Sequence, residues 1–222
     1  MFSDENFAGD KKIDFSLFGK IESRAINYLV PRIPRWIGPH HLTLSTLIWS
    51  AFIVIFSFLA SKYDIRWMWL TSLMIFAQYV TDALDGALGR HRRAGQVRWG
   101  FYMDHFLDYV FLCAILIGYS FILPDKFNTL FFLLATFGAF MVNSYLYFAA
   151  TNKLKIIYLK IGPTEIRLIF IAINTLLIYL HKTYLAKFLP MVLIFTLLGL
   201  IYLVYRSQDE IKKIDKENNL DA

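Results

Sequence analysis

The sequence contains only one cysteine, Cys113, and few charged residues, and both shortages exclude whole classes of protein. A lone cysteine excludes a disulfide scaffold, and 11 Gly and 6 Pro in 222 residues exclude collagen. Charged residues make up 18% of the chain and hydrophobic residues 57%, against about 25% and 45–50% in soluble domains. This composition excludes disorder and indicates a multi-spanning membrane protein. The first 19 residues lack the apolar core of a signal peptide, so we expect no cleavable signal.

Apolar stretches long enough to cross a bilayer recur six times along the chain. They cover residues 42–60, 67–90, 98–123, 128–150, 164–180 and 185–205. Long unbroken runs indicate helices, because a transmembrane barrel has segments of about ten residues with alternating polarity. The sequence therefore predicts an all-α bundle of six transmembrane helices.

The connectors between these stretches alternate in charge. With a cytoplasmic N-terminus, 18 of the 23 Lys and Arg residues face the inside. This bias predicts that both termini are cytoplasmic. We expect a multi-pass protein of the cell (inner) membrane with its active site on the cytoplasmic side. A basic inner face beside anionic lipid accounts for the net charge of +6, so we expect no nucleic-acid partner.

Ahead of the first span, apolar side chains gather on one side of a helical wheel: Leu17, Phe18, Ile21, Tyr28 and Leu29. This pattern predicts an amphipathic helix on the cytoplasmic surface, ended by prolines from Pro31 onward. We therefore divide the chain into an N-terminal part with this helix (1–41), a six-span domain (42–205) and a polar, frayed cytoplasmic tail (206–222).

Acidic side chains are rare within the spans. Of 17 Asp and Glu residues, those in or at the edge of a span are Asp82, Asp85, Asp104, Asp108 and Glu165. A carboxylate at the bilayer centre costs about 2.5–3.5 kcal/mol or more, which makes each of them a functional candidate. Four of the five lie in one hairpin, residues 81–109.

Helical periodicity brings these four carboxylates together. One face of the second span carries, at i, i+3, i+4, i+7 and i+8, Asp82, Asp85, Gly86, Gly89 and Arg90. A stripe on the third span repeats every four residues and consists of Gly100, Asp104 and Asp108. At 1.5 Å per residue, each Asp lies about 7 to 15 Å from the cytoplasmic end of its helix. An antiparallel hairpin therefore places the two pairs at matching depth.

Four converging carboxylates require counter-charge, so either some are protonated or divalent cations lie between them. Oxygen ligands without His or Cys on the stripe favour Mg²⁺ or Mn²⁺ over zinc. Two such ions clamp a phosphate ester for in-line displacement, and Arg90 would face the phosphates as a fork donor. The pattern predicts a phosphoryl-transfer site at a membrane surface.

The complete string, Asp82-x2-Asp85-Gly86-x2-Gly89-Arg90-x9-Gly100-x3-Asp104-x3-Asp108, resembles the signature of the CDP-alcohol phosphotransferase (CDP-alcohol phosphatidyltransferase) family. Seven of the eight fixed positions match. The departure is Gly89, where the family usually has Ala, and we expect it to keep the packing but loosen the helix slightly.

This resemblance implies a CDP-linked donor, an alcohol acceptor, CMP as the leaving group and a requirement for two divalent metal ions. It implies that Asp82, Asp85 and Asp104 are metal ligands and that Asp108 is both a metal-proximal residue and the catalytic base. The CDP-binding positions are then Gly86, Arg90 and Gly100. The family often forms homodimers, so a homodimer is a further expectation.

The acceptor side is less specific. Glu165 and Arg167, at the mouth of the fifth span, and His105, beside Asp104, are the candidate acceptor-binding residues. Glu165 and Arg167 alternatively pair as a helix cap, and His105 alternatively serves packing. A short six-span chain with a basic surface helix resembles the bacterial phosphatidyltransferases, which favours CDP-diacylglycerol as the donor. We expect direct transfer, because no Ser or Cys lies on the motif stripe.

Two other functions fit parts of the pattern. The reverse arrangement, a CDP-aminoalcohol with diacylglycerol as the acceptor, agrees with the Asp104-His105 pair. A cation- or proton-coupled transporter also explains buried carboxylates. It leaves Arg90 at its fixed spacing unexplained, and we find no inverted repeat.

Overall fold

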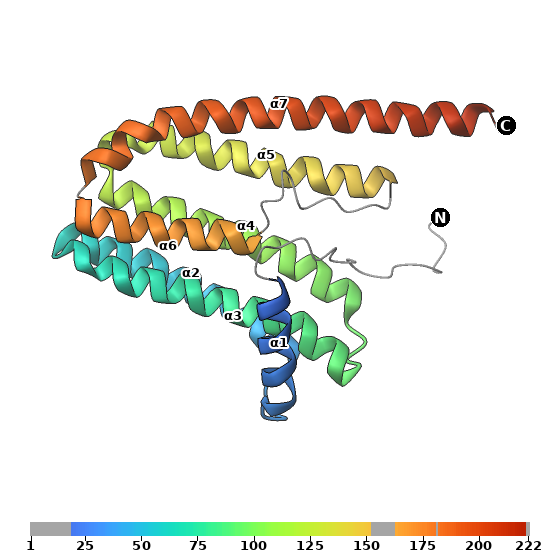
Figure 1. Ribbon diagram of the computed structural model, residues 1–222, viewed down its shortest axis with the longest axis horizontal. Helices are drawn as coiled ribbons and strands as arrows, with labels where there is room; N and C mark the ends of the chain where they lie inside the picture. Colours follow the sequence, from blue (N-terminus) through green and yellow to red (C-terminus); the bar gives the residue numbers. More distant parts are fainter. Residues whose placement is uncertain (1–18, 152–162, 181, 221–222) are drawn as a thin grey trace.

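The computed structural model describes residues 19–151, 163–180 and 182–220, and the described part is all helical apart from short connectors (Figure 1). The expected all-α class is confirmed. The α-helices of this part are α1 (Gly19–Leu29), α2 (Pro39–Lys62), α3 (Met68–Arg92), α4 (Val97–Ile122), α5 (Phe127–Thr151), α6 (Pro163–Leu180) and α7 (Lys182–Leu220).

Within the described ranges, four helical segments are long and apolar enough to cross a membrane, and they are Pro39–Lys62, Val97–Ile122, Pro124–Thr151 and Leu185–Glu217. The other two expected spans lie on α3 and α6, which carry acidic and basic side chains. The count of six spans therefore stays a prediction.

The bundle is arranged around α4, and its core comes from the buried faces of the long helices. α2, α3 and α6 lie on one side of α4, whereas α5 and α7 lie side by side on the other (Figure 1). Ile53 of α2, Ile75 of α3 and Ile122 of α4 are fully buried in one cluster. Large apolar side chains such as Phe131 and Phe195 point outward, as expected of surfaces in contact with lipid.

A buried polar network joins three helices in the middle of this core. The Tyr119 hydroxyl on α4 donates to Asn174 Oδ1 on α6 at 2.9 Å, and Asn174 Nδ2 donates to Ser72 Oγ on α3 at 3.0 Å. Side-chain hydrogen bonds between helices contribute about 0.6–2 kcal/mol each in membranes. The network therefore fixes how α6 is rotated against α3, and this rotation determines which α6 side chains face the hairpin.

Close contact between α2 and α4 depends on Gly118. A Cβ at this position would lie 2.5 Å from Ser57 Oγ and 2.9 Å from Ser57 Cβ. Ser57 is buried and lies 3.4 Å from the Thr71 hydroxyl on α3. A Cβ at position 118 would therefore force buried Ser57 or one of the two helices to shift, which favours glycine here.

Gly118→Ala is accordingly expected to destabilise the protein by about 1–3 kcal/mol through overpacking. The thermal midpoint in detergent is the measurement. Gly199→Ala on α7 is the matched control, because its Cβ would make an ordinary 3.6 Å contact with Phe140 and alanine favours the helix. An unchanged or higher midpoint for Gly118→Ala would show that the two helices can separate without loss.

The expected surface helix is α1, which crosses the direction of the bundle helices near α3 (Figure 1). Leu17 and Phe18 of its expected apolar side lie outside the described residues, as does the rest of the chain before Gly19. Tyr28 and Leu29 are exposed, whereas Ile26 and the following Val30 pack against Leu84 and Leu88 of α3. α1 thus contacts the bundle beside the second half of α3, where the acidic residues lie.

The tail after Tyr205 differs from the expected frayed segment, because α7 continues as a helix to Leu220. Ion pairs at i,i+4 support the extension, at 3.2 Å between Arg206 and Glu210 and at 2.7 Å between Lys213 and Asp209. The Tyr147 hydroxyl of α5 also donates to Glu210 at 2.7 Å. The polar composition of the tail thus belongs to a helix that leaves the apolar part of the bundle.

Candidate active site

The acidic hairpin forms because α3 and α4 are joined by a connector of only four residues, Arg93 to Gln96. Arg93 (φ 50°) and Gly95 (φ 69°) adopt left-handed backbone conformations, which reverse the chain within this short distance. α4 therefore runs back along α3, and the two acidic faces can meet.

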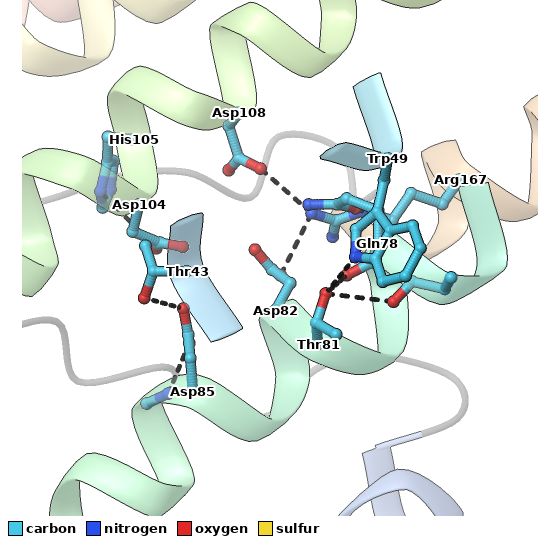
Figure 2. A network of polar contacts seen from close by, with 12 residues as sticks. Thr43, Trp49, Gln78, Thr81, Asp82, Asp85, Asp104, His105, Asp108 and Arg167 are labelled. Carbon is cyan, nitrogen blue, oxygen red and sulfur yellow. Dashed lines mark hydrogen bonds and ion pairs between the residues drawn. The ribbon is translucent and has the colours of Figure 1, made fainter. Parts of the chain in front are cut away.

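Asp82 and Asp108 both form ion pairs with one arginine, Arg167, which lies on α6 (Figure 2). Arg167 Nη2 lies 3.1 Å from Asp82 Oδ2 and 3.0 Å from Asp108 Oδ1. Arg167 Nε donates to Gln78 Oε1 at 2.7 Å, and both of these side chains are buried. Because both ion pairs use the same nitrogen, the two carboxylates converge on the outer end of one guanidinium group. The two halves of the motif are thus together in space.

Asp85 is held by the first long helix. The Thr43 hydroxyl on α2 donates to Asp85 Oδ2 at 2.7 Å, and the Gly86 backbone N–H donates to Asp85 Oδ1. Asp85 and Thr43 are both buried. A carboxylate with a donor on each oxygen has a fixed orientation, so α2 is the third helix that shapes the site.

Asp104 lies one turn before Asp108 on α4, and its carboxylate is on the same side of the hairpin (Figure 2). His105 Nδ1 is 3.8 Å from Asp104 Oδ2 and 2.7 Å from the Phe101 carbonyl oxygen. The His105 ring packs on Phe101 and edge-on against Tyr145 of α5. These contacts agree with a packing role of His105 between α4 and α5, which the sequence leaves open beside acceptor binding.

The expected CDP-binding positions lie next to the carboxylates. A Cβ at Gly86 would lie 3.5 Å from the Arg90 guanidinium, and a Cβ at Gly100 would have no atom of the described protein within 4 Å. Arg90 and Gly86 are both exposed. The absence of side chains at the two glycines therefore leaves room for a ligand to approach the backbone beside the aspartates.

The donor chemistry of the site fits a hard divalent cation, because four carboxylates from two facing helices supply only oxygen ligands. In the part of the chain that the structure describes, no three acidic, His or Cys side chains are close enough to hold an ion as they stand. For Asp82 and Asp108 the reason is Arg167, because its guanidinium forms ion pairs with both carboxylates.

Of the candidate acceptor residues, Arg167 reaches the carboxylates and Glu165 is half-buried in the first turn of α6. Sequence reasoning missed Thr43 and Gln78, although both are polar residues within apolar helices, which is the available signal. A further polar link comes from Arg92. In the structure, Arg92 donates to the carbonyl oxygens of Ile33 (2.8 Å), Pro34 (3.0 Å) and Ile37, and links the end of α3 to the segment before α2.

Thr43→Val is expected to lower turnover by about 10- to 100-fold, the usual effect of losing a partner that orients a metal-binding side chain, if Asp85 acts as the ligand that the sequence predicts. The reason is that Asp85 loses the donor to its Oδ2. The measurement is the initial rate of the catalysed reaction. Thr136→Val on α5 is the control, because this buried hydroxyl donates to the Phe132 carbonyl of its own helix and lies outside the candidate site. Equal activity in the two variants would show that the Asp85 orientation is set elsewhere.

Comparison with known families gave one finding. A model of the CDP-alcohol phosphatidyltransferase family matches residues 36–203, which include α2 to α6 and most of the apolar part of α7. No curated protein matched the chain. The matched range contains every candidate site residue, and it begins just before the Pro39 start of α2.

Proposed function

The chain belongs to the CDP-alcohol phosphatidyltransferase family, a family of transferases for substituted phosphate groups, and we propose that it transfers a phosphatidyl group from CDP-diacylglycerol to the hydroxyl of a polar alcohol. Its apolar helices and its family make it a multi-pass membrane enzyme of phospholipid biosynthesis. The donor, the acceptor class and the roles of individual residues belong to the proposal.

The observation that carries the proposal is the meeting of Asp82 and Asp108 on Arg167. Carboxylates from two helices lie together within a membrane bundle, beside glycines that leave room for a ligand. Such a site binds cations and, through them, phosphate esters. A purely structural polar cluster would not need the exposed Arg90 beside Gly86.

Asp82, Asp85, Asp104 and Asp108 would hold two ions of Mg²⁺ or Mn²⁺. When bound, the ions would neutralise the donor pyrophosphate and the charge on the departing CMP. Gly86 and Gly100 let the donor approach the backbone, and the Arg90 guanidinium donates to its phosphate oxygens.

Asp108 takes the proton of the acceptor hydroxyl. The acceptor oxygen then forms a bond to the phosphatidyl phosphorus while the bond from this phosphorus to the CMP oxygen breaks. Transfer is direct, because neither serine nor cysteine lies on the motif stripe.

The acceptor enters from the α6 side, where Arg167 offers a cation to an anionic group and Glu165 lies in the first turn of the helix. His105 supports this side through its contacts with Phe101 and Tyr145. The acceptor is therefore a polar alcohol that carries an acidic or phosphorylated group. In the sequence, Lys153 and Lys155 add two basic residues to the connector before α6, and both lie outside the described residues.

The bias of Lys and Arg residues supports a cytoplasmic location of both termini and of the active site, in the cell (inner) membrane. A homodimer is the assembly that we expect from the family.

The proposal is tested by following CMP release from CDP-diacylglycerol with the purified protein in nanodiscs and Mg²⁺ or Mn²⁺. The acceptor panel contains glycerol 3-phosphate, inositol, inositol 1-phosphate, serine, choline and no acceptor. Acceptor-dependent release establishes the activity and names the acceptor. If release occurs only from CDP-choline or CDP-ethanolamine with diacylglycerol, the donor assignment is wrong, and if it occurs with neither donor, the chain is not the transferase proposed here.

A further inference from the structure

Arg167 is an unusual cation because it is buried within the helix bundle. Its side chain is 5% exposed, and it contacts Asp82, Asp108 and Gln78 at 3.1, 3.0 and 2.7 Å. A buried guanidinium is tolerated only when carboxylates and hydrogen-bond acceptors compensate for its lost hydration. The three contacts come from α3 and α4, so Arg167 stabilises the meeting of these two helices.

The two carboxylates that neutralise Arg167 are also proposed metal ligands. A divalent cation and a guanidinium within hydrogen-bond distance of the same carboxylates repel each other, and the repulsion is strong where water is largely excluded. Asp82 and Asp108 therefore cannot be fully engaged by both cations at once. When the metal ion binds, the guanidinium therefore has to move away. The Arg167 side chain has several rotatable bonds that allow this movement.

We infer that Arg167 is a resident counter-ion that a divalent metal ion must displace from Asp82 and Asp108, so that metal loading and release of the guanidinium are one coupled step. This inference rests on the proposed function, because it takes the metal ligands from there. It adds that metal affinity is set partly by a residue that is not a ligand.

The contact with Gln78 gives the displaced side chain a pivot. Arg167 Nε donates to Gln78 Oε1, whereas both ion pairs use Nη2 at the outer end of the guanidinium. Because the guanidinium is a rigid plane, a tilt of the whole group through the aliphatic bonds, with Nε kept near Gln78, moves the outer Nη2 farther than Nε and draws it away from the carboxylates. The freed donors then lie at the edge of the site, where an anionic group of a substrate is expected. The order of events is metal first and anionic substrate second.

The test is Mn²⁺ affinity, measured from the loss of the free Mn²⁺ electron paramagnetic resonance signal on titration of protein in nanodiscs. Arg167→Met removes the charge but keeps the length of the side chain, and it is expected to bind Mn²⁺ at least about tenfold more tightly than the parent protein. In chelator its thermal midpoint falls, because Asp82 and Asp108 lose their counter-ion, and Mn²⁺ restores more stability than it adds to the parent.

Arg167→Lys covers the case in which Arg167→Met does not fold. A lysine ammonium is a point charge that lacks the fork of a guanidinium, so the expected affinity lies between those of the parent and the Met variant. Arg206→Met is the control, since Arg206 is an exposed arginine of α7 paired with Glu210, and its Mn²⁺ affinity is expected to equal that of the parent.

Equal or weaker Mn²⁺ binding by the Arg167 variants, with binding by the parent intact, would overturn the counter-ion inference alone and make Arg167 a residue that positions the ligands. Absence of Mn²⁺ binding by the parent, or binding that Asp104→Asn leaves unchanged, would overturn both the metal site of the proposed function and this inference.

Discussion

Asp108→Asn is expected to lower acceptor-dependent CMP release by about 10²- to 10⁴-fold, the usual contribution of a general base. The amide keeps the size of the side chain but cannot accept the proton of the acceptor hydroxyl, and it is a poorer metal ligand. Arg167 retains its ion pair with Asp82 and its hydrogen bond to Gln78, so the variant is expected to fold. Initial rates of CMP release at saturating acceptor are the measurement.

Asp125→Asn makes the same chemical change at an exposed position in the connector after α4, and its rate is expected to equal that of the parent. A thermal midpoint for each variant separates loss of chemistry from loss of fold. If Asp108→Asn retained more than about a tenth of the parent rate, the general base would have to be another group.

Removal of divalent cations is expected to have the second large effect. Chelation with EDTA should reduce CMP release to the background of Asp108→Asn, because the donor pyrophosphate and four carboxylates then share one region without cations to neutralise them. Mg²⁺ or Mn²⁺ added in excess of the chelator should restore the rate.

Asp104→Asn connects this requirement to the proposed ligands. It is expected to raise the Mg²⁺ concentration for half-maximal rate by at least about tenfold. Asp215→Asn, at an exposed position on α7, should leave this concentration unchanged. Full activity in chelator, or identical Mg²⁺ dependence of the two variants, would contradict a metal site at the hairpin.

Local patterns in the sequence were sufficient to predict the helices and the acidic hairpin. Spacings of three and four residues define one face of a helix, so the alignment of Asp82 with Asp85 and of Asp104 with Asp108 follows from helical geometry alone. The sequence also predicts, from the glycines beside these aspartates, that a ligand has room to approach the backbone closely. The family follows from the same string of spacings.

Contacts between helices distant in sequence were beyond the reach of this reasoning. Arg167 lies 59 residues from Asp108 and Thr43 lies 42 residues before Asp85, and periodicity fixes the face of a helix but not its neighbour. The requirement for Gly118 likewise depends on Ser57, a small residue on a different helix. The charged composition of the tail predicted fraying, whereas i,i+4 ion pairs and the bond from Tyr147 to Glu210 keep it helical.

The helical extension of α7 determines how anything attached to the C-terminal end would move. About 15 residues follow Tyr205 in the helix, which at 1.5 Å each corresponds to an arm of about 22 Å. Its first turns are anchored to α5 by the contacts of Ser207 and Glu210 with Asn143 and Tyr147. A fluorophore placed on this arm would rotate with the whole bundle rather than tumble on a tether, so its anisotropy would report the orientation of the enzyme in a supported bilayer.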